Sequence, residues 1–466
     1  MDGKSPYVGI AAKQDEEIKM EQKTTFLLTG TELFSQGALD NVALDNGVLV
    51  IEHVAGRYMQ YGAYTSQELA LPAFCNLNVS WNADIPANTL IEVQARVLTS
   101  SGWSGWLSFG KWAPDYPGKS EAQESDGVFT DGETITVGVQ GGGKAVQVKA
   151  ALFTNDEKST PALRLVAVSV RPLAWEKQQG ILLNQALYLP EYRIASHPTV
   201  FGDSMELPIV LTELINRFGA DALPEEVAYG MVDGANSLCG NAAYGAAFMG
   251  CCGHECYQSW MDLKDLRSEI RNSCAVAVQL EEGVGAANQT IRWVALHGFV
   301  HDEMMSVERV LVGNPLAEQE DEIACSMTLG AFVRSFTGRA IVMRAKPRGV
   351  RRQRPKRLPC YLKKDKHEGA QAGAFCFYQR GEAFPLPEDF NGWIGCAIKD
   401  EIAHATTAKK TFYTLRKSAN QGVLFPPELM VEGQRYNIYA VDENTITRTA
   451  QITIPALIDR KTVEDR

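Results

Sequence analysis

Long apolar runs are missing from this sequence, as is the pattern of a secreted protein held together by disulfides. No segment approaches the roughly 18 apolar residues of a membrane-spanning helix, so we expect no transmembrane segment. The ten cysteines follow no disulfide framework, and we expect reduced, mostly buried thiols. The start, Met1-Asp2-Gly3-Lys4, lacks the apolar part of a secretory signal, which favours a cytoplasmic location.

Positive charge is also in short supply. The 466 residues carry a formal net charge of -11, which favours solubility and argues against specific nucleic-acid binding. A chain of this length predicts about three domains. We find no internal repeat of fixed period that would indicate a solenoid.

The first part of the chain has the pattern of an antiparallel β-sandwich. Residues 1–24 are polar and predict a tail, whereas residues 25–175 contain several short runs that alternate between apolar and polar residues. One run places Ile91, Val93 and Val97 on a single face. Such alternation, interrupted by Gly, Asn, Asp and Pro, is typical of a sandwich.

The pattern changes in residues 176–343, where helical spacing comes first and strands follow. Helices are expected over 208–218, 224–229, 242–249 and 263–270, and strands over 274–280, 291–300 and 307–312. Helices followed by an antiparallel sheet predict an α+β domain.

The remaining chain predicts a linker and a further sandwich. Residues 344–371 are rich in Arg, Lys and Pro, as expected of an extended, solvated linker, although a basic run can also bind anionic partners. Residues 372–460 alternate again and predict a small β-sandwich. The expected fold class is therefore multidomain α+β, a central α+β domain flanked by two β-sandwich domains.

Several short motifs point to one family through their order and spacing. Ser80-Trp81-Asn82-Ala83 and the later Gly105-Trp106 precede a longer set of motifs spread over residues 189–315. That set comprises Leu189-Pro190-Glu191-Tyr192-Arg193, Arg217-Phe218-Gly219, Glu225 to Asp233, Gly240-Asn241, His297-Gly298-Phe299 and Gly313-Asn314-Pro315. Over residues 75–345 the sequence resembles the C39-like, papain-type cysteine peptidases, with the β-sandwich module that often precedes them.

The resemblance implies a papain-like domain, but the positions that should carry the chemistry are substituted. A papain-type site needs a thiolate at a helix N-terminus, a histidine as base and a carboxylate or amide that orients the histidine. By the family's spacing, these positions hold Glu206, Arg292 and Asn314. A carboxylate is a poor acyl-transfer nucleophile, and a guanidinium does not act as a base at neutral pH.

We therefore expect a non-catalytic pseudopeptidase whose former cleft binds a peptide or protein. An ion pair between Glu206 and Arg292 is one hypothesis for that cleft. The alternative is an active cysteine peptidase with a misaligned or relocated nucleophile. Candidates for a relocated nucleophile and its base are Cys239, Cys251, His254, His297 and His301.

Two further patterns suggest ligands only weakly. Cys251, Cys252, His254 and Cys256 are metal-type ligands, but the second pair expected at zinc spacing is missing, so a turn with buried thiols is favoured. The segment Gly138–Lys144 imitates a phosphate loop but continues with Ala145 and predicts a hairpin turn. We expect no cofactor.

Four tryptophans in the first predicted domain leave a third function open. If they share an exposed face they could stack on sugar rings, and the protein would be a carbohydrate-binding protein with a glycan partner. Aromatic residues on sandwich strands more often lie in the core. The four residues are Trp81, Trp103, Trp106 and Trp112.

Overall fold

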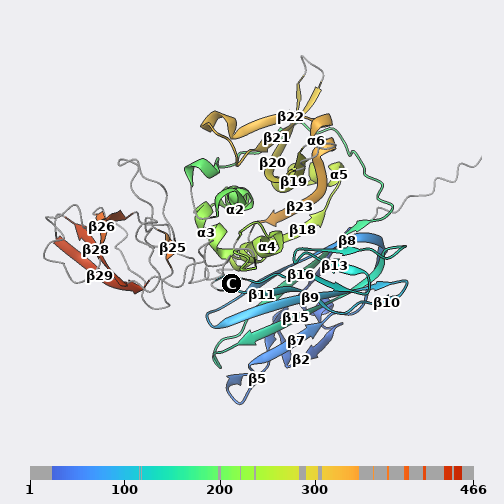
Figure 1. Cartoon of the computed structure of the whole chain (residues 1–466), viewed down its shortest axis with the longest axis horizontal. Coiled ribbons are helices and arrows are strands. Elements are labelled where there is room, and N and C mark those ends of the chain that lie inside the picture. The colour runs from blue at the N-terminus through green and yellow to red at the C-terminus, as the bar shows by residue number, and fades with distance from the viewer. Residues whose placement is uncertain are drawn as a thin grey trace, which may run out of the picture.

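The computed structural model describes residues 24–345 with short gaps, and the backbone of six short strands beyond them (Figure 1). The gaps are 115, 117, 198–200, 221, 236–237, 283–289 and 303–306. The later strands are β24 (Cys360–Tyr361), β25 (Phe375–Cys376), β26 (Trp393–Ala397), β27 (Tyr413–Leu415), β28 (Arg435–Asp442) and β29 (Thr445–Thr453). β-Structure dominates the described chain.

A large antiparallel sheet is formed by the first part of the chain, blue to cyan in Figure 1. Its long strands pair in the order β9-β15-β8-β16, and the shorter strands extend it on both sides. The elements are β1 (Thr25–Thr29), α1 (Gly30–Phe34), β2 (Ala38–Asp40), β3 (Val42–Asp45), β4 (Val48–Ile51), β5 (His53–Val54), β6 (Arg57–Tyr58), β7 (Tyr61–Thr65), β8 (Leu69–Asp84), β9 (Thr89–Thr99), β10 (Gly102–Trp103), β11 (Leu107–Trp112), β12 (Gln123–Ser125), β13 (Val128–Thr130), β14 (Thr134–Val137), β15 (Gly143–Thr154) and β16 (Ala162–Pro172).

The alternating pattern of β9 matches its burial. Ile91, Val93, Ala95 and Val97 are fully buried, while the residues between them are partly exposed. Successive side chains of a strand point to opposite faces, so one face joins the core and the other meets solvent. This confirms the predicted strands. The segment 138–144 links β14 to β15, but both strands pair with β8 and not with each other, so it is not a hairpin.

The second sheet combines with helices in residues 185–344. Its strands follow the order β18-β23-β19-β20-β21-β22, all antiparallel, with β17 paired to β20. The elements are β17 (Gln185–Ala186), η1 (Ile194–Ser196), η2 (Gly202–Met205), α2 (Glu206–Arg217), α3 (Pro224–Gly230), α4 (Ala242–Cys251), β18 (Glu255–Trp260), α5 (Leu263–Arg271), β19 (Val276–Glu282), β20 (Thr290–Asp302), β21 (Val307–Gly313), η3 (Glu320–Glu322), β22 (Ala324–Thr328), α6 (Leu329–Ser335) and β23 (Phe336–Arg344).

Helix α2 has an apolar surface because Leu207, Val210, Leu211 and Leu214 recur at helical spacing, and all are buried. It packs against β20 and β19, while α3 and α4 pack beside it (Figure 1). The predicted helices and strands of this region are confirmed within a few residues at their ends.

Helix α4 and strand β18 dock onto β8 and β16 of the first sheet through buried polar groups. The Asn82 amide donates to the Cys256 carbonyl at 2.7 Å and accepts from the Cys256 N–H at 2.9 Å. Ser169 Oγ accepts from the Trp260 N–H at 2.8 Å, and Tyr244 donates to the Phe109 carbonyl at 2.7 Å. These bonds satisfy backbone groups that a dry interface would otherwise leave unpaired.

The linker predicted to begin at residue 344 overlaps the end of β23. Arg344 is the last residue of β23, and its guanidinium binds both carboxylate oxygens of Glu269, one at 2.7 Å. A bidentate pair of this kind is ordered, unlike a solvated linker residue. The rest of the basic segment lies outside the described residues apart from 345 and 360–361, and so does most of the predicted sandwich at 372–460.

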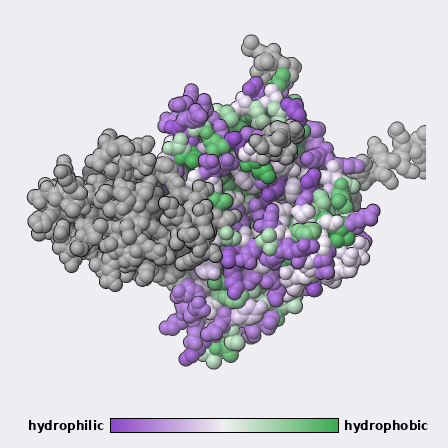
Figure 2. Space-filling model, viewed as in Figure 1, coloured by the Kyte–Doolittle hydropathy of each residue, from purple (hydrophilic) through white to green (hydrophobic). Residues whose placement is uncertain are grey.

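Within the described residues, no helix is both long and apolar enough to span a membrane. Figure 2 shows hydrophilic and hydrophobic residues interspersed over the visible face of the described region, with the hydrophobic patches small and separate.

Candidate functional site

The N-terminus of α2 meets the start of β20, where Glu206, a position that the family spacing singled out, contacts the residue next to another such position, Arg292. Glu206, the first residue of α2, accepts a hydrogen bond at its Oε2 from the Trp293 N–H, at 3.2 Å. Trp293 directly follows Arg292 on β20. The two sequence positions, 86 residues apart, are therefore neighbours in space.

The environment of Glu206 makes its carboxyl group less acidic. Burial raises its pKa, while the hydrogen bond from Trp293 and the charge of Arg292 act in the opposite direction. The carboxyl group therefore holds its proton to a higher pH than an exposed glutamate does. At a helix N-terminus its ionised form is also favoured by the helix dipole.

The hypothesised ion pair between Glu206 and Arg292 is wrong. Arg292 pairs instead with Glu282, whose Oε2 lies 2.8 Å from Nε. Glu282 belongs to the neighbouring strand β19, where it lies opposite Thr290 of β20. It is therefore a diagonal neighbour of Arg292 on the same face of the sheet, within reach of long side chains. This partner depends on the register of the two strands, which a single sequence does not reveal.

The third family position, Asn314, follows β21. The register pairs Gly313 with Ala295, which brings Asn314 to the end of the sheet where Arg292 and Trp293 lie. Its side chain is already engaged, because Oδ1 accepts from the Leu316 N–H at 3.1 Å and so holds a local turn.

Glu133, which directly precedes β14 of the first sheet, is linked to this region by Arg339 of β23. The Arg339 guanidinium carbon lies 5.8 Å from the centre of the Trp293 ring, and its Nη2 lies 2.6 Å from Oε1 of Glu133. Glu133 immediately precedes β14 of the first sheet and also accepts from the Ala242 N–H at the start of α4, at 3.1 Å. The site therefore includes groups from both sheets.

The candidate relocated nucleophiles are buried. Cys239 is fully buried, donates to the Ser204 carbonyl at 3.2 Å, and has its pKa raised by burial to about 12. Cys251 donates to the Ala83 carbonyl at 3.1 Å, and burial likewise raises its pKa. The nucleophile of a cysteine peptidase is an accessible thiolate. Neither residue has that environment.

Two of the candidate histidines, His297 and His301, share strand β20, whereas His254 lies between α4 and β18. His254 is buried, with Nδ1 3.1 Å from the Arg344 carbonyl. His297 on β20 has Nδ1 2.9 Å from the Leu187 carbonyl, and burial lowers its pKa. His301 lies near the far end of the same strand. The hydrogen-bond partner of the Glu206 carboxyl group is the backbone N–H of Trp293.

The weak metal candidates do not converge. Within the described residues there is no group of three or more His, Cys, Asp or Glu placed to hold a metal ion, Cys251, Cys252, His254 and Cys256 included.

The four tryptophans do not share one exposed face. Trp81 and Trp112 are buried and pack with Tyr244 of α4, at ring distances of 6.2 and 6.3 Å. Trp103 and Trp106 are half-buried, and the Arg96 guanidinium lies 4.8 Å from each ring centre. One face of each outer ring is therefore covered by arginine and not open to a sugar.

A buried glutamate was missed by the sequence analysis. Glu213 lies on α2 and is 1% exposed, and its Oε2 has no hydrogen-bond partner. The available signal was a carboxylate seven residues after Glu206 within a mostly apolar run of helix positions. Seven residues are two helical turns, which places it on the same face.

Comparison with known proteins gives a family match for part of the chain. The model described as the peptidase C39 N-terminal domain, an actinobacterial family, matches residues 24–170. This supports the resemblance of the first sheet to a module of C39-like peptidases. The relation of residues 176–343 to papain-type enzymes stays a prediction.

Other comparisons give weaker likenesses. None of the curated proteins compared with the chain matches it. A carbohydrate-binding module (CBM6) of a laminarinase from Zobellia galactanivorans is 12% identical, with 31% of this chain and 98% of that one covered and a TM-score of 0.18. A glucanotransferase from Paenibacillus sp. is 8% identical, with 92% and 44% covered and a TM-score of 0.17. Scores this low do not indicate a shared fold.

Proposed function

We propose that the protein is a non-catalytic homologue of the papain-type C39-like peptidases, and that it binds a peptide or protein segment beside the N-terminus of α2. The observation that carries this proposal is the contact between Glu206 and the Trp293 backbone. It joins the start of a helix to the start of a strand in an antiparallel sheet. A papain-type enzyme needs its thiolate and its imidazole in that relation.

The groups at this junction cannot carry out thiol-based acyl transfer. Glu206 has no thiol, and desolvation makes its carboxyl group harder to ionise. A guanidinium group has donors and no acceptor, so Arg292 cannot serve as the base for a nucleophile. Replacing both reactive groups removes the chemistry but leaves the surface around it.

The same groups suit binding. A half-buried carboxylate at Glu206 can accept hydrogen bonds from backbone N–H groups or from a basic side chain. Arg292 can donate to backbone carbonyls, although Glu282 shares it. The edges of a former protease cleft would thus offer both hydrogen-bond donors and acceptors to an extended peptide.

Thiol labelling tests whether the protein is catalytically silent. The full chain would be treated with iodoacetamide at pH 7 and the modified cysteines identified by mass spectrometry. We expect no cysteine to react faster than an ordinary exposed thiol, with Cys239 and Cys251 slow because they are buried. Rapid, stoichiometric labelling of a single cysteine would support an active cysteine peptidase instead.

Peptide selection tests the binding half of the proposal. Random displayed peptides would be selected on the full chain, and the affinity of each binder measured for wild type, Glu206→Gln and the exposed control Glu320→Gln. Losing a hydrogen bond to a charged group costs about 1.5–3 kcal/mol, so Glu206→Gln should weaken binding roughly tenfold or more. Equal affinity for all three proteins would place the bound peptide elsewhere.

A further inference from the structure

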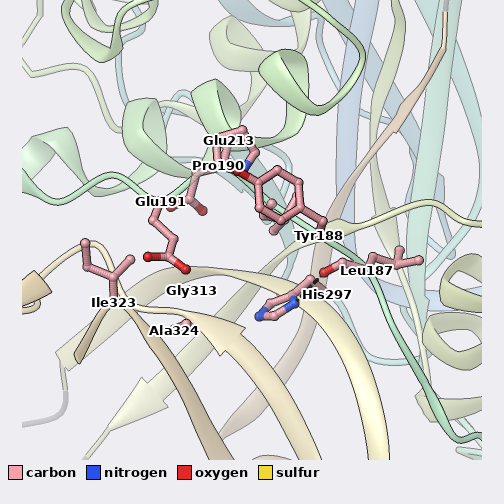
Figure 3. A pocket seen from close by; sticks show the side chains of 10 residues that line it. Leu187, Tyr188, Pro190, Glu191, Glu213, His297, Gly313, Ile323 and Ala324 are labelled. Atoms are coloured by element: carbon pink, nitrogen blue, oxygen red, sulfur yellow. Dashed lines mark hydrogen bonds between the residues drawn. The ribbon is translucent and has the colours of Figure 1, made fainter. Parts of the chain in front are cut away.

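A second site lies further along α2, separate from the Glu206 junction. Glu213 is seven residues beyond Glu206, about 10 Å along the helix axis. It lines a pocket of about 100 Å³ between α2, the segment 187–191 and the strands β20 to β22 (Figure 3). The lining residues are Leu187, Tyr188, Leu189, Pro190, Glu191, Glu213, His297, Gly313, Ile323 and Ala324.

The Glu213 carboxyl group is the unusual feature of this pocket. Its Oε1 accepts a hydrogen bond from the Tyr192 N–H at 3.3 Å, whereas Oε2 is buried without a partner. Oε2 packs closely against Gly313, since a Cβ at that position would lie only 3.0 Å from it. A buried polar atom that lacks a partner costs free energy unless a ligand or water satisfies it.

Two further acceptors border the same space. The Leu187 carbonyl can only accept, so Nδ1 of His297 is the donor in their 2.9 Å hydrogen bond, and Nε2 of the neutral ring is an acceptor. Figure 3 shows the second ring nitrogen and the Glu191 carboxylate directed into the pocket. Burial lowers the pKa of His297, which keeps the ring neutral.

The charged groups around the pocket are unbalanced. Glu191 is exposed at its mouth and raises the pKa of Glu213 further, after the larger effect of burial, to about 8. Arg217 is the cation that acts on His297, but its guanidinium is held by the carbonyls of Tyr188 and Ser273 at 2.6 and 3.2 Å. The ionisable groups that line the space are therefore acceptors, with apolar walls at Leu189 and Ile323.

We propose that this pocket binds a primary ammonium group, with Glu213, Glu191 and His297 accepting its three N–H donors. An ammonium carries three donors and no acceptor, which matches these three acceptors, and the Tyr188 hydroxyl at the pocket can accept as well as donate. The small volume admits an ammonium with a short alkyl stem, and the apolar walls suit that stem. The geometry of the described residues does not suit a metal ion.

Binding should release a proton. Glu213 is neutral below about pH 8 in the free protein, and a cation beside it favours the ionised form. Affinity should therefore rise with pH up to about 8, the range in which Glu213 loses its proton unaided. The inference rests on the pocket alone and does not depend on the function proposed for the Glu206 junction.

Titration calorimetry on the full chain tests the proposal with three probes. Ethylammonium stands for a free amine, Nα-acetyl-lysine methylamide for a lysine side chain, and tetramethylammonium for a cation without N–H donors. We expect about millimolar binding of at least one of the first two, as for any ligand this small, and at least tenfold weaker binding of the third. The tighter of the first two identifies the source of the ammonium.

Variants of Glu213 and Gly313 test whether the ammonium binds in this pocket, by its affinity and by the proton released on binding. Glu213→Gln keeps the shape of the protonated acid, and it should weaken binding at pH 8 at least tenfold and abolish the difference in heat between phosphate and HEPES buffers. Gly313→Ala should block the pocket, and the exposed Glu320→Gln should bind as wild type. The proposal is overturned if neither amine binds, or if Glu213→Gln binds with unchanged affinity and proton release.

Discussion

The side-chain amide of Asn82 pairs with the backbone of Cys256 as a neighbouring strand would, donating to its carbonyl and accepting from its N–H. The same amide nitrogen lies 2.8 Å from the Trp81 carbonyl. Asn82 belongs to β8 of the first sheet and Cys256 to β18 of the second. One side chain thus joins β8 of the first sheet to β18, the edge strand of the second sheet.

Removing this amide should weaken the contact between the sheets. Asn82→Ala leaves the N–H and C=O of Cys256 buried without a partner, at about 1–3 kcal/mol for each group. We expect the free energy of unfolding in urea to fall by roughly 2–6 kcal/mol. Asn76→Ala, on the same strand but bonded to Thr136 near the surface, is the matched control and should cost under about 1 kcal/mol. Similar losses for both would contradict the role assigned to Asn82.

Gly110 and Gly141 allow the energetic cost of backbone strain to be measured apart from the cost of close packing. Gly110 and Gly141 have φ of +87° and +86°, but a Cβ at Gly110 would lie 2.4 Å from the Lys119 carbonyl oxygen and 2.5 Å from the Tyr244 hydroxyl. A Cβ at Gly141 meets nothing within 4 Å. Gly141→Ala should therefore cost about 1–2 kcal/mol, the price of the left-handed conformation. Gly110→Ala should cost several kcal/mol more, measured as the loss of thermal or urea stability.

Glu213 should make stability depend on pH. Its pKa is about 8 in the folded protein against a reference value of 4.5, so between these values the folded state holds a proton that the unfolded state has lost. The stabilising contribution of Glu213 is then fully present below pH 4.5. As the pH rises, the free energy of unfolding falls by about 1.4 kcal/mol per pH unit, until Glu213 ionises in the folded protein near pH 8. Urea unfolding at pH 5, 6, 7 and 8 measures this slope.

The matched variant removes the slope. Glu213→Gln cannot ionise, so it should be more stable than wild type at pH 8 and should lose the part of the pH dependence that wild type owes to this residue. Glu320→Gln, exposed on η3, should keep the wild-type profile. A Glu213→Gln profile that follows wild type across the whole range would show that the carboxyl group is ionised in the folded state.

The Glu206 junction can be tested by restoring the missing chemistry. Glu206→Cys combined with Arg292→His puts a thiol at the start of α2 and an imidazole at the start of β20. A helix N-terminus and an adjacent imidazolium both lower a thiol pKa. We expect this double variant to react with iodoacetamide at pH 7 roughly tenfold faster than Glu206→Cys with Arg292→Gln, which corresponds to about one pKa unit.

The comparison with glutamine isolates the histidine, because both variants lack the guanidinium that would itself attract a thiolate. If the two double variants react at the same rate, residues 206 and 292 do not have the spatial relation of a papain-type pair. The papain-type part of the proposed function would then be lost, while binding of an ammonium near Glu213 would remain open to its own test.

Much of the secondary structure could be predicted, since period-two alternation in β9 and helical spacing in α2 follow from which side chains must be buried. The candidate site was predictable as a set of positions and not as a set of contacts. Glu206 was placed by motif spacing, yet its partner is the Trp293 backbone, and Arg292 turned to Glu282. Strand register decides which long side chains can touch, and a sequence without homologous sequences does not supply it.

The sequence by itself determined the alternating and helical segments of this protein and the lack of a cysteine and a histidine at residues 206 and 292. These are local or compositional properties. Tertiary structure alone decided that Trp81 and Trp112 are core while Trp103 and Trp106 enclose Arg96, and that Glu213 lies beside His297 in a pocket. Burial and pKa depend on which elements pack together, so they arise only when chain segments far apart in sequence come into contact.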